Sequence, residues 1–275
     1  MEIKEKMLES RFGIEIEMTG IIDTHAHYDD EAFNEDREEL LKSMPTENIG
    51  RIVNVGASLE SSKSSLALAK SYEYIFFAAG VHPSDTDKLN DENYKELEGL
   101  LREEKCVALG EIGLDYYWPE PDREIQKKWF EAQLDLAREI KKPVNIHSRD
   151  AFADTFDIIK ATKGYENGGI IHCFSYGVEC AREFLDMGFM LGIGGVLTFK
   201  NGKKLKEVVE YAPLDQLVLE TDCPYLSPEP FRGHRNHSGN IKYVAEKLAE
   251  IKNISVEEAI KATRENALRV YKIAR

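Results

Sequence analysis

Short apolar segments alternate with helical patterns along most of the chain. Eight segments have the apolar character of buried strands, at residues 20–27, 49–55, 74–81, 106–112, 143–147, 169–174, 189–193 and 217–221. Helical periodicity is clearest over 122–141, and two helices, over 240–252 and 255–274, are expected to close the chain. Short strands that alternate with helices predict a parallel sheet with right-handed crossovers.

The number of these units favours one particular α/β fold. Eight strand–helix units in about 250 residues are typical of a closed (β/α)8 TIM barrel. The alternative, an open doubly wound sheet, usually carries a glycine-rich turn after its first strand. Here the first strand runs into "THAHYDD", which has no glycine. We therefore predict a single-domain barrel over residues 20–275.

Residues 1–19, "MEIKEKMLESRFGIEIEMT", precede this pattern and are rich in charge. They form a short N-terminal extension in our interpretation. It is an added hairpin or helix, a flexible arm, or a consequence of where translation starts, since Met18 offers an alternative start.

Polar side chains that suit metal binding occur at the end of the first strand. Asp23, His25 and His27 stand at alternate positions and therefore share one face of the strand. One interpretation is an exposed edge strand with incidental histidines. The other is a pair of metal ligands offered from one strand, and further strand ends favour it. The candidate ligands at or next to strand ends are His25, His27, Glu111, His147, His172 and Asp222.

The barrel fold would bring these six side chains together, because the carboxyl ends of its strands meet at one mouth. Neutral imidazole and carboxylate are ligands of Zn²⁺ and Mn²⁺. A carboxylate can also bridge two ions, and two-metal sites hydrolyse phosphate esters. Each residue alone has an ordinary explanation: Glu111 as a buried ion-pair partner, Asp222 as a helix cap. The joint pattern indicates two divalent ions with positions left open for water.

Other residues near strand ends are weaker candidates for contact with a substrate. His82 follows the third strand, and is either a substrate contact or a loop histidine. Arg149 either holds a phosphate or pairs with an acid at the rim. Arg232 and Arg235 belong to "RGHRNH", which follows the eighth strand, where barrels often hold phosphate. The alternative for this loop is a solvated basic turn.

Composition limits the partners. The chain of 275 residues has a formal net charge of −14, which argues against broad nucleic-acid binding because such binding depends on Lys and Arg. No segment reaches the length of a membrane span, and the four cysteines form no C-x-x-C pair. We expect a cytoplasmic protein without a membrane or stable protein partner. No G-x-S-x-G or P-loop sequence is present.

The chain closely resembles the TatD family of metal-dependent deoxyribonucleases, within the amidohydrolase-like barrel superfamily. The resemblance extends from about residue 20 to the end of the chain. The matching stretches are "IDTHAH", "AAGVHP", "VALGEIGLDYY", "PVNIHSRDA", "IIHCFS", "GIGGVLTFKN", "LETDCPYLSP" and "FRGHRN". Two departures stand out: residues 1–19 have no counterpart in the family, and "RNHS" replaces the usual "RNEP".

The resemblance implies roles for the candidate residues. His25, His27 and Asp222 would hold one ion, His147 and His172 the other, and Glu111 would bridge them. Asp222 would also orient or deprotonate the attacking water, and His82 would lie near the scissile phosphate. Family members are described as Mg²⁺-dependent nucleases, some of them 3′–5′ exonucleases on single-stranded DNA. Four histidines agree better with Zn²⁺ or Mn²⁺ on ligand preference.

Three functions follow for comparison. The first, which we favour, is a metal-dependent phosphodiesterase that acts on DNA. The second is a hydrolase of C–N bonds, an amidase or deacetylase. Many barrels of that type bridge their metals with a carboxylated lysine on the fourth strand, whereas this fourth strand carries Glu111 and no adjacent lysine. The third is a non-catalytic protein with a structural metal, which would close its coordination with protein ligands.

Overall fold

Eight strands form one parallel sheet that closes into a barrel. The computed structural model describes residues 20–274, so the predicted extension over 1–19 lies outside the described residues. The strands are β1 (Ile21–Ala26), β2 (Ile49–Val55), β3 (Ile75–Ala79), β4 (Cys106–Asp115), β5 (Val144–Arg149), β6 (Gly169–Ile171), β7 (Met190–Ile193) and β8 (Leu217–Leu219). They pair in chain order, and a parallel bridge between Ala26 and Cys223 joins the two ends of the sheet. This order confirms the (β/α)8 barrel and excludes the open doubly wound sheet.

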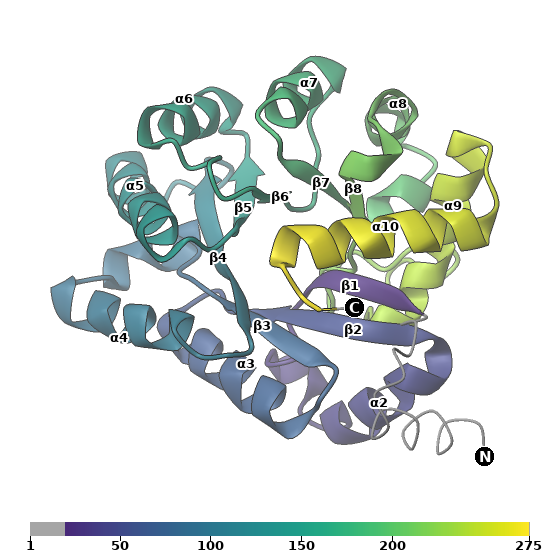
Figure 1. Cartoon of the computed structure of the whole chain (residues 1–275), viewed down its shortest axis with the longest axis horizontal. Helices are drawn as coiled ribbons and strands as arrows, with labels where there is room; N and C mark the ends of the chain where they lie inside the picture. Colours follow the sequence, from purple (N-terminus) through teal and green to yellow (C-terminus); the bar gives the residue numbers. More distant parts are fainter. Residues whose placement is uncertain (1–19, 275) are drawn as a thin grey trace.

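The helices surround this ring of strands (Figure 1). The α-helices are α2 (Arg37–Ser43), α3 (Leu59–Ser71), α4 (Asp91–Leu101), α5 (Arg123–Ile140), α6 (Phe152–Thr162), α7 (Val178–Asp186), α8 (Lys203–Tyr211), α9 (Ile241–Lys252) and α10 (Val256–Tyr271). The 3₁₀ helices are η2 (Glu31–Phe33), η3 (Met44–Glu47), η4 (Pro83–Lys88), η5 (Gly195–Thr198), η6 (Leu214–Gln216) and η7 (Ser238–Asn240). Between residues 20 and 274, no helix has the length and apolar character needed to cross a membrane.

The predicted helix ends agree with the caps that are observed. The side chain of Asp122 accepts a hydrogen bond from the Glu124 N–H at the start of α5, and Lys141 ends this helix in a left-handed conformation. Ser255 caps α10 by accepting from the Glu258 N–H. These local bonds satisfy backbone groups that a helix end leaves free, which is why the sequence located both ends of α5 and the start of α10 well. The end of α10 differs, because it stops at Tyr271 and not at residue 274.

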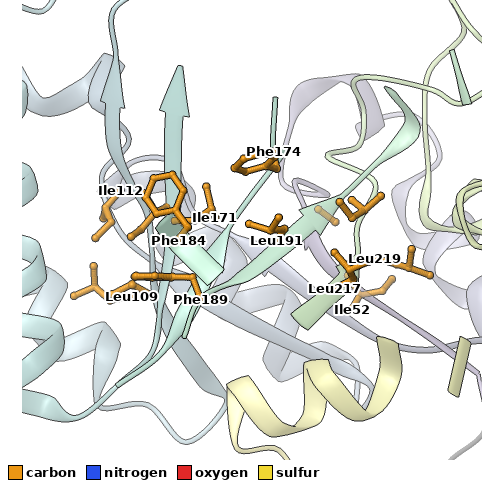
Figure 2. Close-up of a cluster of buried hydrophobic side chains, with 14 of the residues drawn as sticks. Ile52, Leu109, Ile112, Ile171, Phe174, Phe184, Phe189, Leu191, Leu217 and Leu219 are labelled. Atoms are coloured by element: carbon orange, nitrogen blue, oxygen red, sulfur yellow. The ribbon is translucent and has the colours of Figure 1, made fainter. Parts of the chain in front are cut away.

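The hydrophobic core has two layers. The larger layer fills the space between the strands and the surrounding helices. Figure 2 shows part of it, including Phe184 of α7, whose ring centroid lies 6.2 Å from that of Phe189. The smaller layer includes Ile22, Val53 and Val218 of the strands together with Tyr271 of α10. Tyr271 donates a hydrogen bond to the Thr24 carbonyl oxygen at 2.9 Å. Thus α10 covers the end of the barrel where the strands begin, and the opposite end remains for a site.

Six strands end at other residues than predicted: β1 ends at Ala26, β3 at Ala79 and β5 at Arg149, and three further differences bear on the site. β4 continues to Asp115, whereas β6 stops at Ile171 and β8 at Leu219. Cys173 and Asp222 have φ angles of 45° and 55°, so the backbone turns sharply after β6 and β8. This left-handed conformation interrupts the ladder although the apolar run continues in the sequence. His172 and Asp222 consequently lie on turns that follow their strands.

Candidate metal centre

On β1, the buried Asp23 precedes the two histidines and links this strand to distant segments by hydrogen bonds. The Asp23 carboxylate is fully buried and accepts hydrogen bonds from the hydroxyls of Thr221 and Ser238, each at 2.6 Å. Burial raises the pKa of Asp23 to about 7, although these hydrogen bonds lower it. Asp23 thereby fastens β1 to the segment that bears Asp222. Ser238, the last residue of the "RNHS" stretch that departs from the family pattern, has a structural role in this network.

Glu111 lies at the centre of the histidine cluster. Its Oε1 is 2.8 Å from His172 Nε2 and 2.9 Å from His147 Nδ1. Its Oε2 is 3.4 Å from His25 Nε2 and 3.7 Å from His27 Nε2. Each carboxylate oxygen therefore faces a different pair of imidazoles, and the side chain is almost completely buried. This is the arrangement that a bridging carboxylate between two ions requires.

Asp222 completes one half of the cluster. Its Oδ1 is 3.3 Å from His27 Nε2, and its N–H donates to the His25 carbonyl oxygen at 2.9 Å. His25, His27 and Asp222 form a group whose ligand atoms lie within 4.8 Å of one another. This group is the predicted first set of ligands, with Glu111 beside it.

The second half contains more residues than predicted. His147 Nδ1 is 3.3 Å from His172 Nε2. His82, Glu111 and His147 form another group of ligand atoms within 4.8 Å, and His82 Nε2 is 3.8 Å from Glu111 Oε1. His82 therefore lies within the cluster itself rather than at its rim.

The ring nitrogens fit a cation. His27 Nδ1 lies 2.8 Å from the Val55 carbonyl oxygen, which can only accept, so Nδ1 donates and the lone pair of the neutral ring is on Nε2. This Nε2 is 3.1 Å from His25 Nε2. Metal–nitrogen bonds of about 2.0–2.1 Å at angles of about 90–110° place two ligand nitrogens about 2.8–3.4 Å apart. The observed spacing of both imidazole pairs agrees with ligands of shared ions.

Charges in the cluster are strongly coupled. Burial raises the pKa of Glu111, but the charge of His172 and the hydrogen bond from His147 help to outweigh it and hold this pKa well below its usual range. Burial lowers the pKa of His27, whereas the hydrogen bond and charge of Asp222 raise it, to about 9. Protons on the imidazoles thus balance the buried carboxylates. A cation held by these residues would balance the same carboxylates in place of the protons.

Two carboxylates behind the histidines were missing from our sequence interpretation. Asp115 Oδ2 is 3.3 Å from His147 Nε2. Glu220 is fully buried, and its Oε1 is 3.6 Å from His172 Nδ1. Carboxylates in this position orient ligand histidines in metal sites. The alternation of side chains along a strand could have identified both. Asp115 stands four residues after Glu111 and Glu220 two residues before Asp222, so a strand places the members of each pair on the same face.

A cavity of about 710 Å³ opens above the cluster. It is lined by His27, Asp29, Asp30, Ala57, Ser61, His82, Glu111, His147, Ser148, Arg149, His172, Cys173, Ser175, Val196, Asp222, Tyr225 and Leu226. His25, which is 1% exposed, lies beneath it. Buried ligands below an open cavity leave room for water and a substrate.

The predicted arginines differ in their surroundings. Arg149 lines the cavity, whereas Arg232 and Arg235 do not. The guanidinium of Arg235 binds both carboxylate oxygens of Asp36 and lies over the Phe33 ring, 4.9 Å from its centroid. Arg235 therefore has a structural partner, which the sequence could not reveal because Asp36 is remote in the chain.

Comparison with known proteins agrees with this site. A model of the family described as "TatD related DNase" matches residues 22–272. The chain is 43% identical over 253 residues to the uncharacterized metal-dependent hydrolase YabD of Bacillus subtilis, covering 92% of this chain and 99% of that one. It is 35% identical over 256 residues to the uncharacterized metal-dependent hydrolase YcfH of Escherichia coli, covering 92% and 96%.

A solved structure has the same fold. The crystal structure of YJJV, a TatD homolog from Escherichia coli K12, superposes with a TM-score of 0.87 at 31% identity and covers 92% of this chain and 98% of that one. The histidine and carboxylate clusters provide ligands for divalent metal. On this sequence match, fold and donor set, the chain belongs to the TatD-related DNase family and is a metal-dependent hydrolase.

Proposed function

We propose that the chain hydrolyses phosphodiester bonds at the ends of single-stranded DNA, in the 3′–5′ direction, with two divalent ions. The observation that carries this proposal is Glu111, whose two oxygens each face a separate pair of imidazoles at the floor of an open cavity. His25, His27 and Asp222 would hold one ion, His147 and His172 the other. When bound, such ions polarise the phosphoryl oxygen and supply hydroxide near neutral pH.

Protein side chains then position the substrate and move the proton. Asp222 lines the cavity, and its carboxylate accepts the proton of the attacking water. Burial lowers the pKa of His82 to about 4, so its ring is neutral. The Ser84 N–H donates to His82 Nδ1 at 3.1 Å, which assigns the ring proton to Nε2. His82 is therefore a neutral donor to an oxygen of the scissile phosphate.

The cavity walls favour a phosphate over an amide substrate. Arg149 is the only lysine or arginine among the described residues that line the cavity, and its guanidinium can bind two oxygens of one phosphate. No lysine is present there to form the carbamate bridge of many C–N hydrolases. The four imidazoles favour Zn²⁺ or Mn²⁺ over Mg²⁺, which prefers oxygen ligands.

The test is hydrolysis by protein stripped with a chelator and then reloaded. Stripping should abolish cleavage of 5′-labelled single-stranded DNA, and Mn²⁺, Zn²⁺ or Mg²⁺ should restore it, with products that shorten stepwise from the 3′ end. Bis(p-nitrophenyl) phosphate and p-nitroacetanilide serve as the diester and amide controls. Amide hydrolysis without diester hydrolysis under every metal would refute the proposal and favour the C–N hydrolase.

Glu111→Gln tests the bridging role. It preserves the volume of the side chain and removes the charge that both ions share. Because loss of residues behind a ligand already costs about 10–100-fold in metal affinity or activity, we expect loss of about 100-fold or more, with reduced metal at both positions. Glu131→Gln, an exposed position on α5, is the matched control. Full metal content in Glu111→Gln, measured by mass spectrometry of metals, would contradict a bridging carboxylate.

A further inference from the structure

Exposed apolar side chains gather at the mouth of the barrel. Within residues 20–274, the exposed large hydrophobic residues are Tyr117, Trp118, Ile125, Tyr211, Tyr225, Leu226 and Phe231. Five of these seven lie in the segments that follow β4 and β8, and only Ile125 and Tyr211 lie elsewhere, on α5 and at the end of α8. Apolar surface that is exposed in one place usually marks a binding surface.

The segment after β4 forms the first lip of the cavity. The Arg149 guanidinium, which lines the cavity, lies 3.8 Å from the centroid of the Tyr117 ring. Tyr117 in turn meets Trp118 with ring centroids 4.9 Å apart and an interplanar angle of 90°. The Tyr117 N–H donates to Asp115 Oδ1 at 2.9 Å, and Asp115 also contacts His147. The planar side chains of Arg149, Tyr117 and Trp118 therefore contact one another in a row from the cavity to the solvent. Asp115 links this row to His147 of the metal centre.

The segment after β8 forms the second lip. β4 and β8 lie four strands apart in the eight-stranded ring, so the two lips stand on opposite sides of the mouth. Tyr225 and Leu226 line the cavity, and the Tyr225 hydroxyl donates to Asp30 Oδ2 at 2.9 Å, which holds its ring in place. Arg232 lies over the Phe199 ring, 4.3 Å from its centroid.

Arg149, at the end of β5 beside the first lip, and Arg232 of the second lip have free hydrogen-bonding edges. Among the described residues, neither Arg149 nor Arg232 has a carboxylate within the 4.0 Å of an ion pair, whereas Arg235 is paired with Asp36. Each instead stacks on an aromatic ring. Stacking orients a guanidinium and leaves its N–H groups available for a phosphate.

From these contacts we propose that the two lips are a stacking platform for the unpaired bases of a single-stranded nucleic acid. Trp118 and Tyr225 supply exposed ring faces, and Arg149 and Arg232 meet the phosphates between the bases. A duplex hides its base faces, so only an unpaired end can stack here. The net charge of −14 repels a polyanion, so aromatic contacts must supply much of the affinity. This inference rests on the proposed function, because it names how that site selects its substrate.

Trp118 is a natural reporter for the test. The chain has two tryptophans, and Trp129 is 7% exposed while Trp118 is 58% exposed. Metal-loaded protein is titrated with a phosphorothioate oligothymidylate, which resists cleavage, and with an abasic strand of the same length and charge. We expect the oligothymidylate to quench fluorescence and the abasic strand to bind about tenfold more weakly. The quenching should disappear in Trp118→Leu.

Variants separate stacking from other effects. Trp118→Leu should weaken oligothymidylate binding about tenfold, measured by anisotropy of a labelled strand, and leave abasic binding unchanged. Trp118→Phe keeps a ring face and should retain most of the affinity. Tyr211→Ala, an exposed aromatic away from the mouth, is the control and should change neither.

The outcomes distinguish this inference from the proposed function. Equal binding of abasic and normal strands, or equal competition by duplex, overturns the platform even if single-stranded DNA is hydrolysed. Emission of Trp118 that shifts with neutral lipid vesicles but not with oligothymidylate identifies a membrane contact and also overturns it. Base-dependent quenching through Trp118 supports the platform even where no phosphodiester is cleaved.

Discussion

Glu220 is a buried carboxylate behind two candidate ligands. Its Oε1 accepts from the Cys173 N–H at 2.6 Å, while its Oε2 and the Nδ1 atoms of His25 and His172 have no hydrogen-bond partner within residues 20–274 despite burial. One ligand atom from each of these three residues lies within 4.8 Å of the others. A carboxylate there holds the proton on Nδ1 and leaves Nε2 of each ring free for a metal. Glu220 is thus a positioning residue that serves one histidine of each proposed ion.

Glu220→Gln should therefore weaken metal binding without unfolding the barrel. The amide has the same shape but cannot accept from both rings, so we expect metal affinity to fall about 10–100-fold. Competition with a chromophoric chelator measures this affinity, and circular dichroism follows the fold. Glu131→Gln again provides the matched control. Metal affinity equal to that of the unmodified chain would show that Glu220 only fills space.

Among the individual site residues, the sequence identified those that stand next to strand ends. His25, Glu111 and His147 could be found because a barrel brings strand ends together, whatever their distance in the chain. Asp115 and Glu220 were missed because carboxylates next to a cluster resemble ordinary surface acids until their burial is known. The pairing of Arg235 with Asp36 depends on a contact between remote segments, and no local pattern reports such a contact.

Among the elements, β4 has the most demanding geometry. Gly113 has a φ of +142°, and a Cβ built there would lie 1.9 Å from the His147 carbonyl oxygen. Gly113 pairs with His147 across β4 and β5, so the two strands that carry Glu111 and His147 depend on this close approach. Only glycine fits both the backbone conformation and the space.

Gly113→Ala should push β4 away from β5. We expect a loss of about 2–5 kcal/mol in the free energy of unfolding, from backbone strain and overpacking together, and reduced metal content. Gly99→Ala on α4 is the control, because its Cβ would meet nothing within 4 Å and should stabilise the helix by about 0.5–1 kcal/mol. Urea unfolding measures both changes. If the urea concentration at half-unfolding were unchanged in Gly113→Ala, β4 would be able to accept a Cβ without losing stability.

The number and order of the strands were predictable from the sequence, whereas the residues at which the strands end were less predictable. All eight strands were located because strands buried on both faces appear as apolar runs between helices. β6 was expected to extend to residue 174, but it ends at Ile171 because Cys173 adopts φ 45°. The sequence "IIHCF" continues the apolar run past this turn. The turn that presents His172 to the cavity is thus set by tertiary contacts, such as that of the Cys173 N–H with Glu220.

For the whole molecule, charge decides how a polyanion can approach. Two lysines at the end of the barrel away from the mouth already have backbone partners: Lys105 donates to the carbonyl oxygens of Ala69 and Tyr72, and Lys142 to that of Cys106. With a net charge of −14, the remaining surface repels nucleic acid. We therefore expect the favourable charge contacts with a strand to lie mainly at the mouth, at Arg149 and Arg232.

This confinement predicts a weak salt dependence of binding. Each phosphate contact on a single strand contributes about −0.7 to the slope of log affinity against log salt, so two arginines give a slope of about −1.4. Anisotropy of a labelled phosphorothioate strand over a range of KCl concentrations measures it. Arg149→Gln and Arg232→Gln should each reduce the slope by about 0.7, whereas Arg235→Gln should not change it, because Arg235 is bound to Asp36. A slope near −4, which corresponds to about six contacts, would show that the strand follows a longer surface path than the mouth provides.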